Sequence, residues 1–277
     1  MQVKASIKKE LLAYSRTKKL LIIALVFLGW SVLSPLMIRG VGVMMEALNP
    51  IYDDMGMDIS GMTDMLGSSS SLGVTSAVSD LGGACLIVLI LLINSNAGGE
   101  QKKRSIMIPR SSGLRSFSYI FPKFIVYPPI AFVLSVAGAF CAWGTSAIIF
   151  DYNDVALSGV LVGGMLAGVS IMFYVCVHLT LGTATGQAGM SAAVCIVASM
   201  LLPNIFAMTS SDYMYNPFTL NIIAGSAVQP GMLSLTPPED IIVTVLIALG
   251  IMVILYFIAL FAQNARRIDN SGNEIRL

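Results

Sequence analysis

Two ionisable residues fall within long apolar runs, and they are the first candidates for chemistry. Asp80 lies near the outer end of the run at 77–97, and His178 lies near the inner end of the run at 157–181. Ionisable groups inside membrane spans are costly and often mark substrate or ion pathways. Both residues are therefore candidate substrate contacts. An ordinary helix-end carboxylate and a packed imidazole are the simpler interpretations.

The residue types give little support for ATP hydrolysis, intramembrane catalysis or metal binding by this chain. The chain has no GxxxxGK[ST] loop, so we expect no ATP hydrolysis by this subunit itself. It has one histidine and no Ser/His/Asp arrangement, which argues against an intramembrane enzyme. The four cysteines lie in apolar runs without CxxC spacing, and we expect no metal or cofactor in this chain. Thioether ligands for copper remain a minor alternative, carried by Met44, Met45, Met55, Met57, Met62 and Met65.

Hydrophobic residues make up 56% of the 277 positions and charged residues 11%, which indicates that lipid is the solvent for most of the chain. Backbone groups in a bilayer must be paired within the protein, so apolar runs of about 20 residues predict spanning helices. We predict an all-α membrane protein with one transmembrane domain over 1–277. The six predicted spans are 20–38, 77–97, 123–150, 157–181, 190–206 and 241–261.

The segments outside these spans differ in character. Val3, Ile7, Leu11 and Tyr14 recur at helical spacing among basic residues, which favours an amphipathic interface helix, with a solvated basic tail as the alternative. The outer loop 40–74 is too polar to span, and a loop this long is uncommon unless it is functional, locally helical or disordered. The outer loop 207–240 holds an apolar patch at 218–224 that suits a segment dipping into the membrane without crossing.

The distribution of charge predicts the orientation. Of the sixteen Lys and Arg residues, fifteen fall on one side of the predicted spans and only Arg39 falls on the other. Eleven of the fifteen acidic residues, Asp80 included, fall on the side of Arg39. The positive-inside rule makes the basic side cytoplasmic. We therefore expect a multi-pass protein of a bacterial inner membrane with both termini in the cytoplasm.

Four glycines in the fourth span form two small-xxx-small pairs. Gly159 and Gly163 make one pair, and Gly164 and Gly168 make the other. Such pairs allow another helix backbone to approach closely. They serve packing either within the chain or between copies of it.

The connection between the second and third spans, 100–123, is strongly basic and is the only internal loop on its side long enough to form a structured surface. A Glu that follows the second span, a basic stretch, a Pro-Arg turn and a Lys that enters the third span resemble the corresponding loop of ABC-2 type permeases. The resemblance implies a short cytoplasmic coupling helix that docks into a groove on a separate ATPase subunit. The residues that it marks for partner coupling are Glu100, Arg104, Pro109, Arg110, Leu114 and Lys123.

This resemblance implies the membrane subunit of an ATP-binding cassette exporter. It would work as a dimer, or with a related permease, beside two ATPase subunits that bind ATP and Mg. Peptides, lipids and drug-like molecules are the substrates of such permeases, and membrane lipid but no nucleic acid is an expected partner. An ion-coupled carrier that depends on Asp80 or His178 is one alternative, and a non-transporting immunity or sensor component is another.

Overall fold

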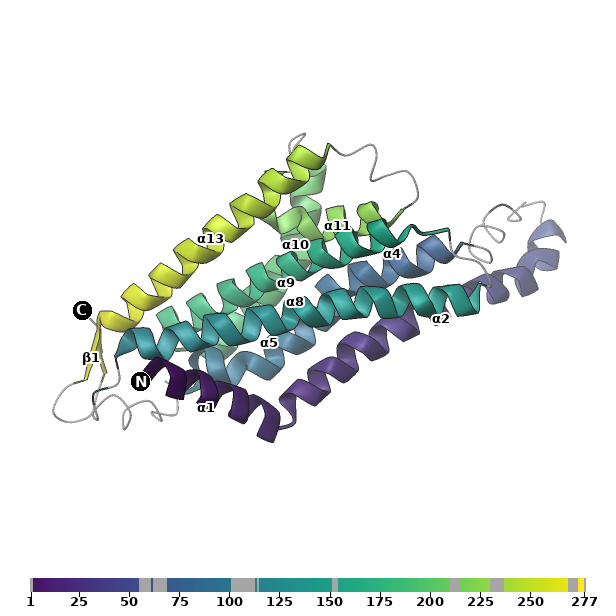
Figure 1. The fold of residues 1–277 in the computed structure, drawn as a ribbon. Coiled ribbons are helices and arrows are strands. Elements are labelled where there is room, and N and C mark those ends of the chain that lie inside the picture. Colours follow the sequence, from purple (N-terminus) through teal and green to yellow (C-terminus); the bar gives the residue numbers. More distant parts are fainter. Residues whose placement is uncertain are drawn as a thin grey trace.

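The computed structural model describes residues 2–54, 61, 69–100, 113, 115–150, 154–209, 215–229, 237–268 and 274–276. Within these residues, six helical segments are long and apolar enough to cross a membrane, as the apolar runs predict. They form an elongated bundle with the N- and C-termini at the same end (Figure 1). The predicted six-span, largely helical architecture is therefore confirmed.

Five single helices and one composite segment form the six spans, and one further helix precedes them. The N-terminal helix α1 (Gln2–Arg16) precedes the span α2 (Lys19–Asp54). The second span consists of α4 (Ser70–Asp80), η1 (Leu81–Cys85), α5 (Leu86–Asn94) and η2 (Ser95–Gly99). The remaining spans are α8 (Ser116–Ile149), α9 (Leu157–Thr185), α10 (Ala188–Thr209) and α13 (Pro238–Asn264). A short hairpin follows, made of β1 (Arg266–Ile268) and β2 (Glu274–Arg276).

Helix α2 is longer than the first predicted span. It continues past residue 38 to Asp54, although Pro35 and Pro50 lie inside it. Proline is tolerated in membrane helices because neighbouring groups satisfy the freed carbonyls. Helix α4 begins at Ser70, before the predicted end of the outer loop. Both ends of the predicted loop 40–74 are therefore helical, while 55–60 and 62–68 lie outside the described residues.

The second span contains two π-helical turns, η1 and η2, both rich in small residues. Such turns insert an extra residue into a helix and re-aim the side chains that follow. Gly82 in η1 lies directly against the side chain of Asn221. In η2, a Cβ atom on Gly98 would stand 2.6 Å from the carbonyl oxygen of Gly182 in α9. The two turns therefore occur where neighbouring helices approach closely.

Helix α9 is the most buried of the six spans and lies at the centre of the bundle. Gly159 and Gly163 face the short helix α11 (Leu220–Val228), where added Cβ atoms would meet its backbone carbonyls. Gly164 and Gly168 face α8, against Ala139 and Phe132 respectively. Both glycine pairs are thus used for packing within the chain.

The outer segment before the last span contains a short apolar helical piece. The turn η4 (Pro217–Thr219) leads into α11, and the Asn216 side chain caps this start by accepting a hydrogen bond from the Phe218 backbone N–H. Helix α11 packs against α9 and α4, and most of its apolar residues are buried, whereas Ile222 is exposed. At nine residues it is too short to cross a bilayer, which needs about 20.

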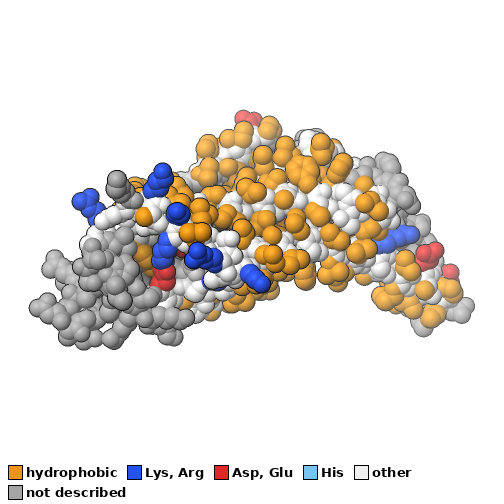
Figure 2. All heavy atoms as spheres, turned by 60° about the horizontal axis from the view of Figure 1, so that its bottom comes forward, with side chains coloured by type: hydrophobic (Ala, Val, Ile, Leu, Met, Phe, Trp, Pro, Cys, Tyr) orange, Lys and Arg blue, Asp and Glu red, His pale blue; other side chains and the backbone are white. Residues whose placement is uncertain are grey.

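On the face shown in Figure 2, a broad apolar band covers much of the described surface, and most of the charged side chains lie toward its two ends. Helices α10 and α13 are the least buried spans, and large apolar side chains such as Leu246, Phe257 and Met200 are exposed on them. Soluble monomers rarely expose apolar patches of this extent. The band is therefore the face that meets lipid or another membrane helix.

Candidate functional site

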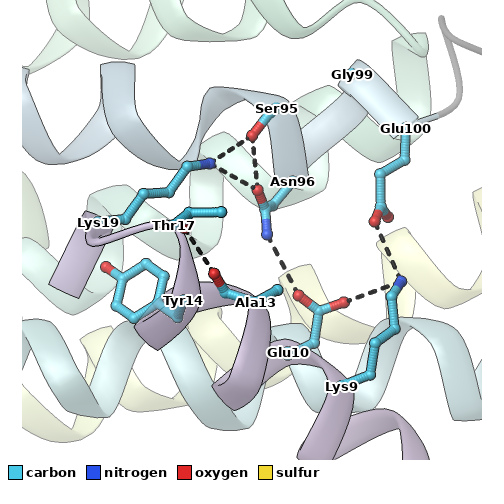
Figure 3. Close-up of a pocket in the computed structure, with 10 residues that line it drawn as sticks. All are labelled: Lys9, Glu10, Ala13, Tyr14, Thr17, Lys19, Ser95, Asn96, Gly99 and Glu100. Atoms are coloured by element: carbon cyan, nitrogen blue, oxygen red, sulfur yellow. Dashed lines mark hydrogen bonds and ion pairs between the residues drawn. The ribbon is translucent and has the colours of Figure 1, made fainter.

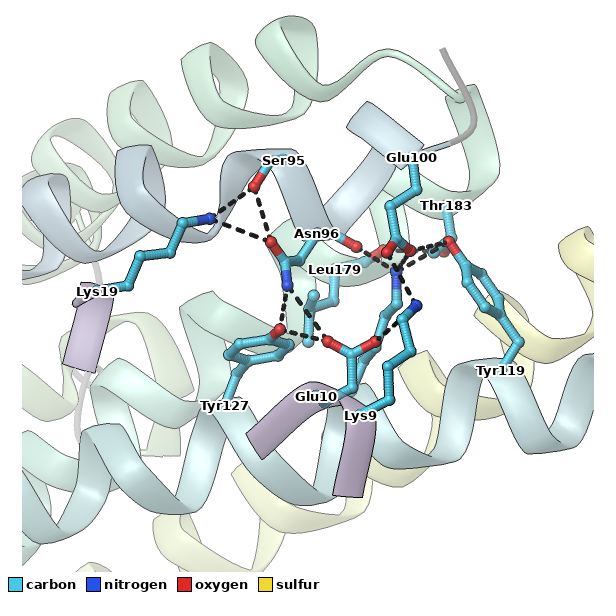
Figure 4. Close-up of polar contacts among 11 residues, drawn as sticks. Lys9, Glu10, Lys19, Ser95, Asn96, Glu100, Tyr119, Tyr127, Leu179 and Thr183 are labelled. Atoms are coloured by element: carbon cyan, nitrogen blue, oxygen red, sulfur yellow. Dashed lines mark hydrogen bonds and ion pairs between the residues drawn. The ribbon is translucent and has the colours of Figure 1, made fainter. Parts of the chain in front are cut away.

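Helix α8 carries three polar side chains at a spacing of four residues, Tyr119, Lys123 and Tyr127. Residues four apart lie on one face of a helix, one turn above another. This face points toward the end of the second span and toward α1, and all three side chains are buried or nearly so. The polar face of α8 is the framework of the candidate site (Figure 4).

Lys123 is fully buried at the centre of this face. Its Nζ donates to Glu100 Oε2 at 2.6 Å, to the Asn96 carbonyl oxygen at 2.5 Å and to the Tyr119 hydroxyl at 2.8 Å. The ammonium also lies 4.1 Å from the centre of the Tyr119 ring. Burying an ammonium is unfavourable unless it is paired and hydrogen-bonded. Three acceptors match its three N–H groups, so the charge is satisfied.

Glu100 joins this lysine to α1. Its second oxygen, Oε1, lies 3.2 Å from Lys9 Nζ, and Oε2 also accepts the Tyr119 hydroxyl at 2.8 Å. Burial by itself would raise the pKa of Glu100, but the charge and hydrogen bond of Lys123, with the Lys9 charge and the Tyr119 hydroxyl, lower this pKa to about 2. Glu100 is therefore ionised at neutral pH, and its carboxylate forms ion pairs with both Lys9 and Lys123.

A second carboxylate, Glu10 of α1, is almost completely buried on the other side of Lys9. Its Oε2 accepts the Tyr127 hydroxyl at 2.6 Å and the Asn96 side-chain amide at 3.3 Å, and its Oε1 lies 3.7 Å from Lys9 Nζ. By contrast, Leu11 on the predicted apolar stripe is 47% exposed. Helix α1 therefore packs against the bundle through this polar contact, which the stripe does not predict, as well as through Tyr14 of the stripe, which is 2% exposed (Figure 3).

Asn96, in the π-helical turn η2, connects the two halves of the site. Its amide nitrogen donates to Glu10 and to the Tyr127 hydroxyl, and its Oδ1 accepts from Lys19 at 3.3 Å and Ser95 at 2.7 Å. Its backbone carbonyl accepts from Lys123. We call the connected set the basic-end network; its members are Lys9, Glu10, Lys19, Ser95, Asn96, Glu100, Tyr119, Lys123 and Tyr127.

The aromatic contact between Tyr14 and Tyr127 closes the network on the α1 side. The two rings pack edge to face with their centres 5.2 Å apart. Burial raises the pKa of the Tyr14 hydroxyl above its usual value, so it stays protonated. Helix α1 is thereby held to α8 by one aromatic pair and one buried carboxylate.

Two of the six residues marked for partner coupling, Glu100 and Lys123, meet in this network. The other four, Arg104, Pro109, Arg110 and Leu114, lie outside the described residues, as does most of the predicted coupling helix. The described part of the connection consists of Glu100, Gly113 and residues 115–123, and an ion pair of 2.6 Å joins Glu100 to Lys123.

The two candidate substrate contacts lie apart from each other. Asp80, half-buried in α4, accepts the Ser34 hydroxyl at 3.1 Å. His178 is fully buried in α9, where its Nδ1 lies 3.2 Å from the Ser191 hydroxyl and its Nε2 has no hydrogen-bond partner among the described residues. Asp80 is nearer the α11 end of the bundle, and His178 is one turn from Gly182 at the basic end. They do not form one site.

Several residues of the network carry only a weak sequence signal. Glu10 is the single acidic residue before Glu46, and Tyr119 and Tyr127 flank Lys123 at helical spacing. Asn96 has no such signal, because its role depends on the turn η2 and on helices distant in sequence. Among the residues that the structure describes, no group of three His, Cys, Asp or Glu side chains is arranged to hold a metal ion.

No family model matches this chain, and no curated protein matches it.

Proposed function

We propose that this chain is the membrane-spanning subunit of an ATP-binding cassette exporter of the ABC-2 type. It works as a dimer, or with a related permease, together with two ATPase subunits that bind ATP and Mg. The exported substrate is a peptide, a lipid or a drug-like molecule. The observation that carries the proposal is the basic-end network, which ties both ends of the connection 100–123 to α1.

A permease subunit that is driven by a separate ATPase must transmit a movement from its docking surface to its membrane spans. Glu100 begins the connection and Lys123 ends it, and their ion pair fixes the two ends to each other. Asn96 and Tyr127 continue the contact into the second span, α8 and α1. The buried centre of this network, at Lys123, has its donors paired and resists deformation, so a push on the connection moves the helices rather than being absorbed in the loop.

The distribution of charge supports the location in a bacterial inner membrane with both termini in the cytoplasm. The two termini and both ends of the connection 100–123 lie at the same end of the bundle. On the predicted topology, fifteen of the sixteen basic residues belong to the segments of that side. By the positive-inside rule this end faces the cytoplasm, which is where an ATPase partner binds ATP.

The test is purification of the protein with the ATPase encoded beside it, followed by replacement of residues 107–114 by a Gly/Ser linker. We expect loss of the complex and loss of substrate-stimulated ATP hydrolysis. A Gly/Ser replacement of residues 62–68, in the opposite outer loop, is the control and is expected to retain the complex. If the complex and the stimulated hydrolysis both survive the 107–114 replacement, the docking assignment is wrong.

An ion-coupled carrier is the second candidate, and Asp80 is the observation that favours it. This carboxylate lies within a membrane span and accepts a hydrogen bond from Ser34, in the manner of an ion-binding group. In proteoliposomes, such a carrier would keep transporting without the ATPase, stop with a proton or sodium uncoupler, and fail in the Asp80→Asn variant. Transport that needs the ATPase and ATP, and that the uncoupler leaves intact, excludes this candidate.

A further inference from the structure

Helix α2 continues well beyond the helices packed beside it. The three helices α2, α4 and α8 meet at Pro35, where a Cβ atom on Gly73 would stand 3.2 Å from the Pro35 Cβ and 3.0 Å from the Ser146 hydroxyl oxygen. Helix α4 begins three residues before Gly73, and α8 ends three residues after Ser146, so both stop within about one turn of this level. Helix α2 runs on from Pro35 to Asp54, and Figure 1 shows its last turns projecting past the other helices.

The projecting part of α2 is too long to remain in the bilayer. Lys19 begins the helix and Arg39 follows twenty residues later, a rise of about 30 Å, which is the thickness of the hydrocarbon core. Residues 40–54 add about 22 Å, whereas the headgroup layer on one side is only about 5–8 Å thick. We call residues 40–54 the outer extension of α2. Its last turns therefore stand in water.

The outer extension exposes an apolar face. Val43 and Ile51 are each 50% exposed and Met44 is 56% exposed, and Ala47 is exposed between them. Residues spaced by three, four and seven positions share one side of a helix. Large apolar side chains that stay together in contact with water commonly mark an interaction site. This face therefore lacks the apolar partner that its composition favours.

Carboxylates line one edge of the apolar face. Glu46 and Asp53 are both exposed and lie seven positions apart, which is two helical turns. Residues 40–54 contain three acidic residues and no Lys or Arg. A second copy of the extension packed on this face would bring like charges together, and an anionic membrane surface is disfavoured for the same reason. The complementary partner has an apolar face and positive charge.

The side chains of the extension suit a helical partner. Methionine is flexible and polarizable, and it is frequent on surfaces that adapt to different amphipathic helices. Met44 lies on the exposed face, and aliphatic and acidic groups lie beside it. An amphipathic helix is recognised through apolar residues at helical spacing, and a basic edge on that helix pairs with carboxylates.

We propose that the outer extension of α2 binds a basic amphipathic helical peptide on the side of the membrane opposite the basic-end network. Val43, Met44 and Ile51 contact the apolar face of the peptide. Glu46 and Asp53 pair with its ammonium groups. The proposal depends on the membrane setting of the bundle but not on the exporter function.

The test measures binding of a fluorescent synthetic peptide to the full chain in phosphatidylcholine nanodiscs by fluorescence anisotropy. The peptide is a helix of leucine and lysine with all leucines on one face, and its binding to nanodiscs without protein is subtracted. We expect Ile51→Ser to weaken binding about five- to tenfold, because half of an isoleucine side chain loses its burial. Glu46→Gln should weaken binding about two- to fivefold, as expected for the loss of an exposed ion pair.

Two control variants make the same changes on the same side of the bundle but outside the extension. Ile148→Ser alters a side chain that is 80% exposed near the end of α8. Glu239→Gln alters an exposed carboxylate at the start of α13. Both variants should bind the peptide as the unmodified protein does.

Three results would overturn the proposal. The first is equal affinity of a test variant and its control, which would mean that the extension is not the binding surface. The second is equal binding of a peptide with the same composition in scrambled order, which would mean that charge alone attracts it. The third is binding to the unmodified protein that does not exceed binding to nanodiscs without protein. The last two comparisons use the unmodified chain and so do not depend on how the variants fold.

Discussion

Replacement of Glu100 by Gln tests whether the basic-end network holds the end of the bundle together. The substitution keeps the size of the side chain but removes the charge that pairs with the buried Lys123. The ammonium then stays buried beside neutral acceptors. We expect the free energy of unfolding to fall.

The magnitude follows from the geometry. Removing one partner of a buried ion pair costs about 3–5 kcal/mol. Here the Glu100 side chain is 24% exposed, and Lys123 keeps the Tyr119 hydroxyl and the Asn96 carbonyl as acceptors. Both features reduce the loss, and we expect about 2–3 kcal/mol for Glu100→Gln.

A double-mutant cycle separates the ion pair from the rest of the network. Lys123→Met replaces the ammonium by an apolar side chain of similar length, and replacing a buried pair by apolar residues is often neutral. The double variant should therefore recover most of the stability that Glu100→Gln loses. The assay is reversible unfolding in mixed micelles of increasing denaturing-detergent fraction, followed by circular dichroism. Glu239→Gln, at the exposed start of α13, is the control and should change stability by less than about 0.5 kcal/mol.

Two outcomes would refute this reasoning. A loss below about 0.5 kcal/mol for Glu100→Gln would mean that the carboxylate contributes no more than a surface charge does. Additive effects of Glu100→Gln and Lys123→Met, within about 0.5 kcal/mol, would mean that the two groups do not interact.

Two further predictions follow from contacts at the same end. Gly98→Ala should lower the free energy of unfolding by about 1–3 kcal/mol, since its Cβ would stand 2.6 Å from the Gly182 carbonyl oxygen. Gly144→Ala is the control and should not lower it, because no atom lies within 4 Å of the added Cβ. Equal losses of stability in the two variants would contradict the close packing at Gly98. The folded-state pKa of Glu100 is about 2, below its unfolded value of about 4.3, so its contribution to stability is complete above pH 4.3 and is lost as the pH falls toward 2. Unfolding measured from pH 6 to pH 2.5 should show this loss, and the Glu100→Gln variant should lose less; parallel pH profiles would contradict the assignment.

The spans were predictable because their signal is local. An apolar run long enough to cross a bilayer has few other stable conformations, so the six helices follow directly from the sequence. The extension of α2 to Asp54 did not follow, because Glu46 and Asp53 in its last turns resemble a polar loop. Helix length beyond the membrane is decided by local propensity and neighbouring contacts rather than by hydropathy.

The site was only partly predictable. Glu100 and Lys123 stood out by position at the ends of one basic connection. The burial of Glu10 did not, because α1 folds back on the bundle through the turn at Lys18, which adopts a left-handed backbone conformation unusual for a lysine. The contact between Glu10 and Tyr127 spans 117 positions in the sequence, and no local pattern encodes such a pairing.

The burial of Lys123 also bears on how the protein is made. Its three acceptors, Glu100, Tyr119 and the Asn96 carbonyl, all lie within 27 residues before it in the chain. The second and third spans therefore contain every group needed to neutralise this lysine, without help from later helices. Once α8 has been synthesised, these three acceptors are present, so this lysine can be paired before the later helices are made.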